Sequence, residues 1–312
     1  MRFAVSDLDA LSIANYALFK NDMFGSPLDA LRAYLKSTPE RPDHVGIAVA
    51  GPVDGDHARL TNRPWTLSAR EIMEVYGARN VHFVNDFEAI ALSLPHLARE
   101  DVVQIGGDTA SAGTAMAVLG PGTGLGVAGL IRSPLGDVAL AGEGGHVAFA
   151  ARTREDFEIV EGLRADLDFV SAEHVISGPG LVTLYQTLAS RAGQPAAPIS
   201  PETVVNRAMD GADAIASRTL ELFVLWLGRF AGDVALTLGA RAGVYIAGGI
   251  APRILPLLQS GQFRSAFEDK GRLSSYLAAI PIHVVATPNA GLKGAALAVS
   301  RSVDRPLARS VQ

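Results

Sequence analysis

The chain has 312 residues, enough for one large domain or two ordinary ones with a sizeable hydrophobic core. Its hydrophobic fraction of 48% and charged fraction of 19% exclude an intrinsically disordered protein. The formal net charge of −5 gives no reason to expect nucleic-acid or membrane partners. The absence of cysteine excludes a disulfide framework, a thiolate zinc site and a cysteine nucleophile, and it suits a reducing, cytoplasmic location.

Short apolar segments alternate with helical patterns along the chain. Strands are expected at residues 3–5, 13–19, 44–50, 81–84, 102–105, 115–119, 127–131, 243–247 and 281–285. Helices are expected at residues 27–35, 87–94, 154–167, 180–191, 201–209, 212–238 and 291–299. This alternation predicts an α/β protein with largely parallel sheets, in which residues 44–50 and 243–247 form buried strands.

The most apolar long stretch, residues 212–238, predicts a core-packed helix and not a membrane span. At about 100° per residue, four of its charged residues fall on one narrow helical stripe: Arg218, Glu221, Arg229 and Asp233. A membrane span needs about 20 mostly uncharged residues.

Two glycine segments follow apolar strands. Residues 120–126 read Gly-Pro-Gly-Thr-Gly-Leu-Gly, and glycines let backbone amides approach a phosphate closely. This segment is neither a Walker loop nor a dinucleotide turn, so a tight β-hairpin is the simpler interpretation. Residues 247–250, Ala-Gly-Gly-Ile, end a strand where α/β folds place ligands, although on their own they fit a packing role better.

Polar side chains gather in three separated segments. Asn85 and Asp86 follow a strand, where a carboxylate can serve as a general base and either residue can cap a helix. Glu143 and His146 lie in a Gly-Glu-Gly-Gly-His turn, for which an exposed turn or a metal site is the alternative. Glu173 lies shortly before Ser-Gly-Pro-Gly, which also suits a surface loop with a helix cap. Together these groups suit sugar hydroxyls.

In order and spacing, these motifs resemble bacterial glucokinase from Met1 to about Val299. The resemblance is carried by residues 84–87, 122–126, 142–146, 171–173 with 177–180, 246–250 with 252–253, and 263–272. The related repressor–kinase family carries a cysteine-rich zinc motif after its Glu-Gly-Gly-His-like segment. This chain has no cysteine and so resembles glucokinase proper.

The resemblance implies an actin-like, ribonuclease H-like ATPase fold with two α/β lobes. The small lobe is expected to comprise residues 1–96 plus 287–312, and the large lobe residues 97–286. The implied reaction is ATP-dependent phosphorylation of glucose at the 6-hydroxyl, with ATP and Mg²⁺ as cofactors and no metal held by the protein alone. Relatives are often dimers, so the resemblance also implies a homodimer.

The resemblance also assigns roles to residues. Asp86 takes the proton from the sugar 6-hydroxyl. The remaining hydroxyls are held by a set of polar side chains: Asn85, Glu143, His146, Glu173 and, from a separate loop, Asn62. The second phosphate loop is formed by Gly122, Thr123 and Gly124. The adenosine lies beside Gly248 and Gly249.

The sequence departs from the family pattern in one respect. It contains no Asp-x-Gly-Gly-Thr turn, which in the family grips the β- and γ-phosphates and helps to hold Mg²⁺. Residues 2–5 align with the family's second strand, so we expect a small lobe truncated at its N-terminus, with an exposed sheet edge or hydrophobic gap. This predicts severely reduced turnover. A non-catalytic glucose-binding or regulatory protein and a kinase for another hexose remain alternatives.

Overall fold

The computed structural model describes residues 1–107, 113–194 and 198–304. The chain divides into two compact units. The terminal unit contains Met1–Leu97 together with the chain from Thr287 onward, and the central unit contains Ala98–Ala286. Within the described part of the chain, none of the helices combines the length and apolarity that crossing a membrane requires.

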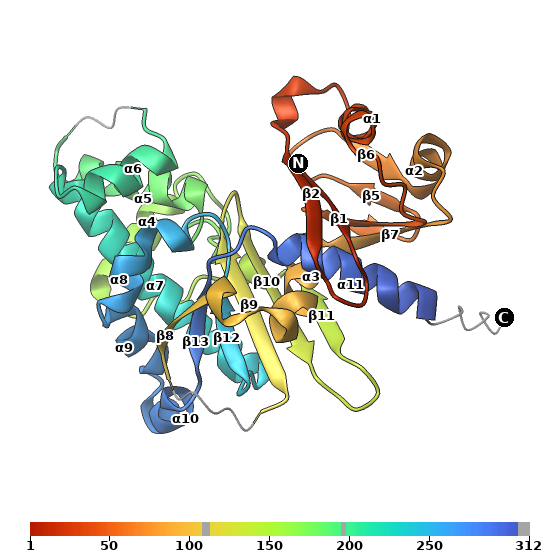
Figure 1. Ribbon diagram of the computed structural model, residues 1–312. Helices are drawn as coiled ribbons and strands as arrows, with labels where there is room; N and C mark the ends of the chain where they lie inside the picture. The colour runs from red at the N-terminus through yellow and green to blue at the C-terminus, as the bar shows by residue number, and fades with distance from the viewer. Residues whose placement is uncertain (108–112, 195–197, 305–312) are drawn as a thin grey trace. The chain divides into compact units, whose positions relative to one another are not determined.

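The terminal unit is an α/β unit of short strands and a few helices (Figure 1). Its strands are β1 (Arg2–Ser6), β2 (Ile13–Leu18), β3 (His44–Val49), β4 (Val53–Asp54), β5 (His57–Arg59), β6 (Thr66–Ser68) and β7 (Asn80–Asn85). Its α-helices are α1 (Pro27–Ser37), α2 (Ala69–Tyr76), α3 (Asp86–Ser93) and α11 (Ala290–Asp304).

The longer strands of this unit form two separate pairs. β1 pairs antiparallel with β2, and β3 pairs parallel with β7, while β4, β5 and β6 form a small antiparallel sheet. Among the described residues, each strand of these two pairs therefore has a strand partner on one side only. The expectation that residues 44–50 are buried is wrong except for Val49, because β3 has a strand neighbour on one side only.

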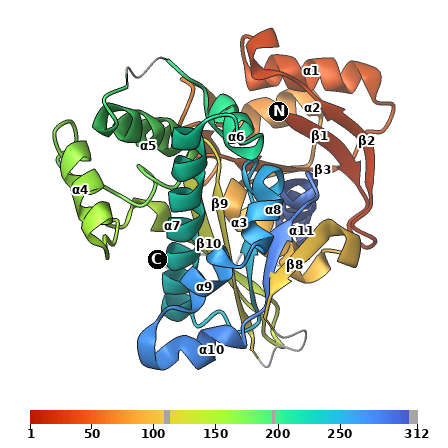
Figure 2. The ribbon, with the colours of Figure 1, turned by 90° about the vertical axis from the view of Figure 1, so that its left-hand side faces the viewer.

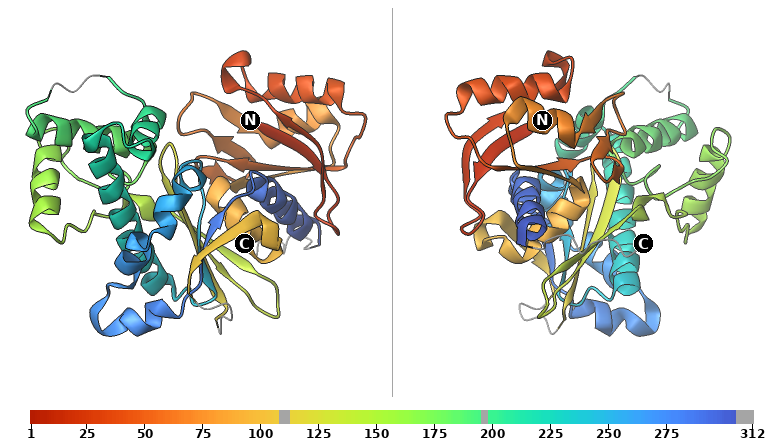
Figure 3. Two further views of the ribbon diagram at one scale, coloured as in Figure 1. Left: turned by 60° about the vertical axis from the view of Figure 1, so that its left-hand side comes forward. Right: turned by 90° about the vertical axis from the view of Figure 1, so that its right-hand side faces the viewer.

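Helix α11 joins the two strand pairs, since it contacts β1, β3 and β7. It also lies alongside α3, as Figure 3 shows. The last helix of the chain is therefore part of the same unit as its first strands.

The central unit consists of one sheet and a layer of helices. Its strands are β8 (Val102–Gly106), β9 (Ala115–Pro121), β10 (Leu125–Ile131), β11 (Val138–Gly142), β12 (Gly243–Ile246) and β13 (Ile282–Val285). Its α-helices are α4 (Arg154–Leu163), α5 (Gly178–Arg191), α6 (Pro201–Met209), α7 (Ala214–Leu238), α8 (Leu255–Gln259), α9 (Gln262–Glu268) and α10 (Ser274–Ala278).

The prediction of largely parallel sheets is wrong. The six strands of the central sheet lie in the order β11-β10-β9-β12-β13-β8. Only the pairings of β12 with β9 and with β13 are parallel, because the glycine segment after β9 turns the chain straight back into β10 and a second hairpin adds β11. Elements that alternate along a sequence need not be joined by parallel crossovers.

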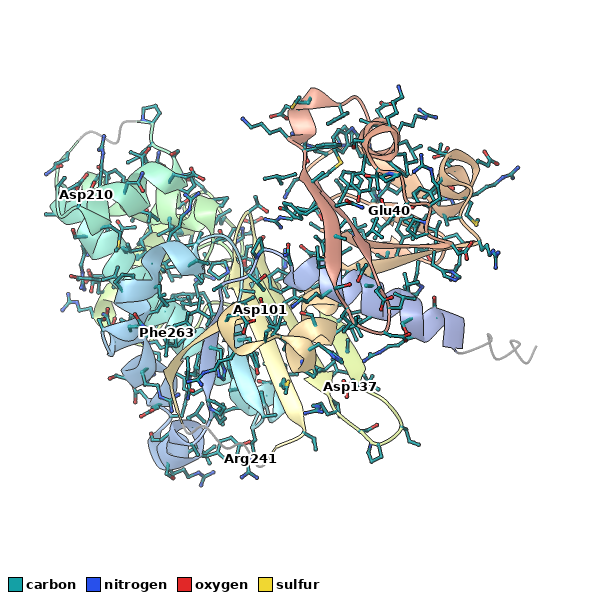
Figure 4. All side chains as sticks on the ribbon, in the orientation of Figure 1. Glu40, Asp101, Asp137, Asp210, Arg241 and Phe263 are labelled. Carbon is teal, nitrogen blue, oxygen red and sulfur yellow. The ribbon has the colours of Figure 1, made fainter. Side chains whose placement is uncertain are left out.

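Helix α7 organises the core of the central unit. It contacts β9, α5, α6 and α9, and it runs along the helical layer in Figure 2. The side chain of Phe263 on α9, labelled in Figure 4, is fully buried in this core. The charged side chains of the predicted stripe on α7 form ion pairs. For example, Arg229 Nη1 lies 2.7 Å from Asp156 Oδ2. This confirms a core-packed helix.

Candidate active site

The glycine segment at residues 120–126 is a β-hairpin. Leu125 of β10 is the register partner of Pro121 in β9, and Gly122 to Gly124 form the loop between them. The Gly122 N–H donates to the Gly124 carbonyl at 2.8 Å, which tightens the loop. The prediction of a tight β-hairpin is therefore confirmed. Thr123 lies at the centre of its turn.

The second glycine segment packs against this hairpin. Gly248 follows β12 with a φ of +86°, and a Cβ atom there would lie 2.5 Å from the Pro121 carbonyl oxygen. Gly248 therefore has the packing role that the sequence favours, because a larger residue would collide with the hairpin backbone. A Cβ atom on Gly249 would meet nothing within 4 Å, so this residue borders open space beside the hairpin. The fold thus brings the two predicted nucleotide-binding segments together within the central unit.

A short antiparallel ribbon brings Glu173 to the Gly-Glu-Gly-Gly-His turn. The Phe149 N–H donates to the Val170 carbonyl at 3.0 Å, and the Glu173 N–H donates to the Gly145 carbonyl at 2.9 Å. Between these bonds, Ala148 forms a β-bridge with Ser171. Two segments that are far apart in sequence are in this way held side by side by backbone bonds.

Glu143, His146 and Glu173 form one polar cluster in the central unit. His146 Nδ1 lies 3.7 Å from Glu143 Oε2, and its Nε2 lies 3.7 Å from Glu173 Oε1. The side chains of Glu143 and His146 are 84% and 62% exposed, whereas that of Glu173 is 30% exposed. Two carboxylates and an imidazole at this separation present acceptors and a donor that several sugar hydroxyls can satisfy together.

Helix α5 begins beside the glycine hairpin. The Ser177 side chain accepts a hydrogen bond from the Gly180 N–H at 3.0 Å and so caps the helix, as one interpretation of this segment predicts. The Gly178 N–H donates to the Gly122 carbonyl at 2.8 Å. The start of the helix is therefore attached to the hairpin loop.

The terminal unit carries the remaining predicted site residues. The Asn85 side chain caps α3 by accepting from the N–H groups of Phe87 and Glu88 at 2.9 and 3.2 Å. Its side-chain oxygen is thus committed to the helix, while Asp86 occupies the first turn, where a helix dipole favours a negative charge. The alternative that this segment caps a helix is confirmed for Asn85.

Asn62 lies in the turn between β5 and β6. The neighbouring Thr61 N–H donates to the Ala50 carbonyl at 3.1 Å, and Ala50 directly follows β3. Val49, the last residue of β3, is the register partner of Asn85. The structure therefore ties the Asn62 turn to the end of the strand pair from which Asn85 and Asp86 emerge.

Two features of the site were not predicted from the sequence. The Leu125 N–H donates to Glu173 Oε2 at 2.7 Å, which links the polar cluster to the glycine hairpin. His174 Nδ1 accepts from the Ser171 N–H at 3.1 Å and so fixes the turn before Glu173. The spacing Ser-x-x-His signals the second feature, whereas no local pattern signals the first.

No cluster of three or more His, Asp or Glu side chains placed to hold a metal ion occurs among the residues with described positions.

The chain is similar to known proteins over nearly its whole length. The family model described as Glucokinase matches residues 1–302. The glucokinase of Tolumonas auensis is 41% identical over 293 residues, which cover 94% of this chain and 91% of the relative. The crystal structure of a glucokinase from an Antarctic psychrotroph is 36% identical, with a TM-score of 0.84 and coverage of 96% of this chain and 95% of that one.

A more distant structure shares the fold. The ROK family glucokinase from Streptomyces griseus, solved with glucose and AMPPNP, is 18% identical with a TM-score of 0.66, and the match covers 96% of this chain and 95% of that one. The fold is thus the expected actin-like ATPase fold. From the family match over nearly the whole chain and the identity to curated relatives, the chain belongs to the glucokinase family.

Proposed function

We propose that this protein transfers the γ-phosphoryl group of ATP to the 6-hydroxyl of glucose. The observation that supports this most is the cluster of Glu143, His146 and Glu173 beside the glycine hairpin, because it joins a set of hydroxyl-binding groups to a loop suited to phosphate. Membership of the glucokinase family favours glucose over other hydroxyl-bearing ligands.

In this proposal each side chain has a defined task toward the sugar. The carboxylates of Glu143 and Glu173 accept hydrogen bonds from neighbouring hydroxyls, and His146 supplies an imidazole between them. Asn85 uses its side-chain amide as a donor, since its oxygen caps α3. Asn62 adds a further polar contact.

Asp86 accepts the proton of the 6-hydroxyl as the hydroxyl oxygen bonds to the γ-phosphorus. The bond between the γ-phosphorus and its bridging oxygen breaks, and ADP leaves with the electron pair. Because phosphoryl transfer passes through a loose transition state, the protein contributes chiefly by orienting groups and balancing charge. The carboxylate of Asp86 orients the attacking oxygen.

The glycine segments serve the nucleotide in this proposal. In the loop of Gly122, Thr123 and Gly124, the Thr123 and Gly124 amides and the Thr123 hydroxyl face the phosphates, while the Gly122 N–H holds the loop through the Gly124 carbonyl. Gly248 and Gly249 lie beside the adenosine, where the open space at Gly249 leaves room for a base or ribose. Mg²⁺ enters with ATP and neutralises the phosphate charge.

A coupled assay tests the proposal. Glucose, fructose and N-acetylglucosamine are each offered with MgATP, and formation of sugar phosphate is followed by mass spectrometry, with calorimetry measuring sugar binding separately. We expect glucose 6-phosphate as the main product, because the family match favours glucose. Preference for another sugar would contradict the substrate assignment.

A second candidate is a glucose-binding protein without transfer, in which the cluster of Glu143, His146 and Glu173 binds sugar alone. The same experiment separates the two functions. Glucose binding with no detectable glucose 6-phosphate would favour the non-catalytic role.

A further inference from the structure

We propose that Glu173 is a positioning residue for the phosphate hairpin as well as a sugar ligand, and that it makes sugar and nucleotide binding cooperative. This inference rests on the function proposed above and assigns an additional task to one member of the cluster. In this inference, the Glu173 carboxylate is the group through which binding of one substrate raises the affinity for the other.

The two oxygens of Glu173 face different parts of the site. Oε2 accepts a hydrogen bond from the Leu125 N–H at 2.7 Å, at the point where the hairpin loop enters β10. Oε1 faces His146 Nε2 at 3.7 Å. One oxygen is thus committed to the hairpin, while the other belongs to the polar cluster.

Gly124 permits this contact. A Cβ atom on Gly124 would lie 2.5 Å from Glu173 Oε2, so a side chain at this position would push the carboxylate away from the Leu125 amide. The glycine is therefore required for the approach of an acidic side chain, in addition to any role toward a phosphate.

The segment that carries Glu173 holds the hairpin loop at both ends. Glu173 binds the Leu125 amide, and the Gly178 N–H donates to the Gly122 carbonyl at 2.8 Å. The Glu173 backbone is itself fixed by the bond from its N–H to the Gly145 carbonyl at 2.9 Å. A sugar that orders the Glu173 carboxylate therefore also orders the loop that meets the nucleotide.

The size of the coupling follows from this hydrogen bond. Because the acceptor of this bond is a charged carboxylate, its loss is expected to weaken nucleotide binding about tenfold or more. Binding linkage is reciprocal, so glucose should raise nucleotide affinity by the same factor by which nucleotide raises glucose affinity.

Calorimetry on the full chain tests the inference, with MgAMPPNP as the nucleotide probe, with and without saturating glucose. In Glu173→Ala we expect about tenfold weaker nucleotide binding in the absence of sugar and loss of the coupling. Glu173→Gln keeps a neutral acceptor oxygen for the Leu125 amide, so it should weaken glucose binding and lower nucleotide affinity less than Glu173→Ala does. Glu143→Ala is the matched control, expected to weaken glucose binding only.

The outcomes separate the inference from the proposed function. Unchanged nucleotide affinity in Glu173→Ala overturns the inference. Equal loss of nucleotide affinity in Glu143→Ala also overturns it, because any charge removed from the cluster would then act alike. A wild-type chain that binds neither MgAMPPNP nor glucose contradicts the proposed function itself. Circular dichroism and thermal unfolding check that each variant is folded.

Discussion

Gly294 of α11 lies directly against the carbonyl oxygen of Ala89 in α3, so closely that a Cβ atom on Gly294 would overlap that oxygen. The contact is between helix backbones and leaves no flexible side chain to move aside. Because α3 begins at Asp86, the last helix of the chain fixes the helix that carries the proposed base.

Gly294→Ala is therefore expected to destabilise the protein and to displace α3. Overpacking of this kind costs about 1–3 kcal/mol in free energy of unfolding, and activity should fall because Asp86 moves with the helix. Gly291→Ala is the matched control, since a Cβ atom there meets nothing within 4 Å. Urea unfolding measures both variants, and equal stability of the two would contradict the close helix contact.

The second prediction concerns His283, whose ring stacks on Tyr245 with centroids 5.0 Å apart and whose Nδ1 is buried without a hydrogen-bond partner. Burial lowers the pKa of the His283 imidazole. The unfolded chain, with a histidine pKa of about 6.5, then binds more protons than the native state, so the free energy of unfolding falls as the pH drops below about 6.5.

His283→Phe retains a ring that can stack on Tyr245 but removes the titratable imidazole. We expect a smaller loss of stability between about pH 6.5 and pH 5 than in the wild type, measured by urea unfolding at several pH values. His57→Gln, at an exposed histidine, is the control. If the free energy of unfolding of His283→Phe fell as steeply with falling pH as that of the wild type, protonation of His283 would not be the cause of the fall.

The third prediction concerns Asp156, a fully buried carboxylate in α4 that anchors α7 through Trp226 and Arg229. Burial acts to raise the pKa of Asp156, but hydrogen bonds from Arg152 N–H, Trp226 and Thr153 N–H and the charge of Arg229 together lower it. Its contribution to stability is thus fully present above about pH 4 and is lost as the pH falls further.

Asp156→Ala should lower the free energy of unfolding at pH 7 by about 3–5 kcal/mol, because Arg229 would stay largely buried without its partner. The difference from the wild type should shrink in unfolding curves recorded below about pH 4. Asp168→Ala, at an exposed aspartate, is the control. A difference that is the same at pH 3 and pH 7 would show that the charge of Asp156 is not the cause.

The longer elements were predictable from local pattern. The strands near residues 3–5, 81–84 and 115–119 and the helices α5, α6 and α7 lie where apolar periodicity and capping residues indicate them. Strands β5 and β6 were missed because each spans three residues and carries little apolar pattern, and α2 was missed with them. The prediction of largely parallel sheets was wrong because the direction of a strand relative to its neighbour depends on which strands pair, and the local sequence does not specify that pairing.

The site was predictable in its residues but not in its connections. Motif order identified Glu143, His146 and Glu173, and the structure brings these three together. Their meeting depends on backbone bonds between residues 145–149 and 170–173, which no local sequence pattern specifies. The bond from Leu125 N–H to Glu173 likewise requires the fold, because 48 residues separate its two partners.

The most direct test compares wild type and Asp86→Asn for formation of glucose 6-phosphate from MgATP and glucose, with glucose affinity measured by calorimetry on the same samples. The account predicts that the wild type forms glucose 6-phosphate, and that the variant binds glucose with similar affinity but reacts about 10²–10⁴-fold more slowly, because a positioned base is lost. Equal rates in the two proteins, or glucose binding without product in the wild type, would contradict it.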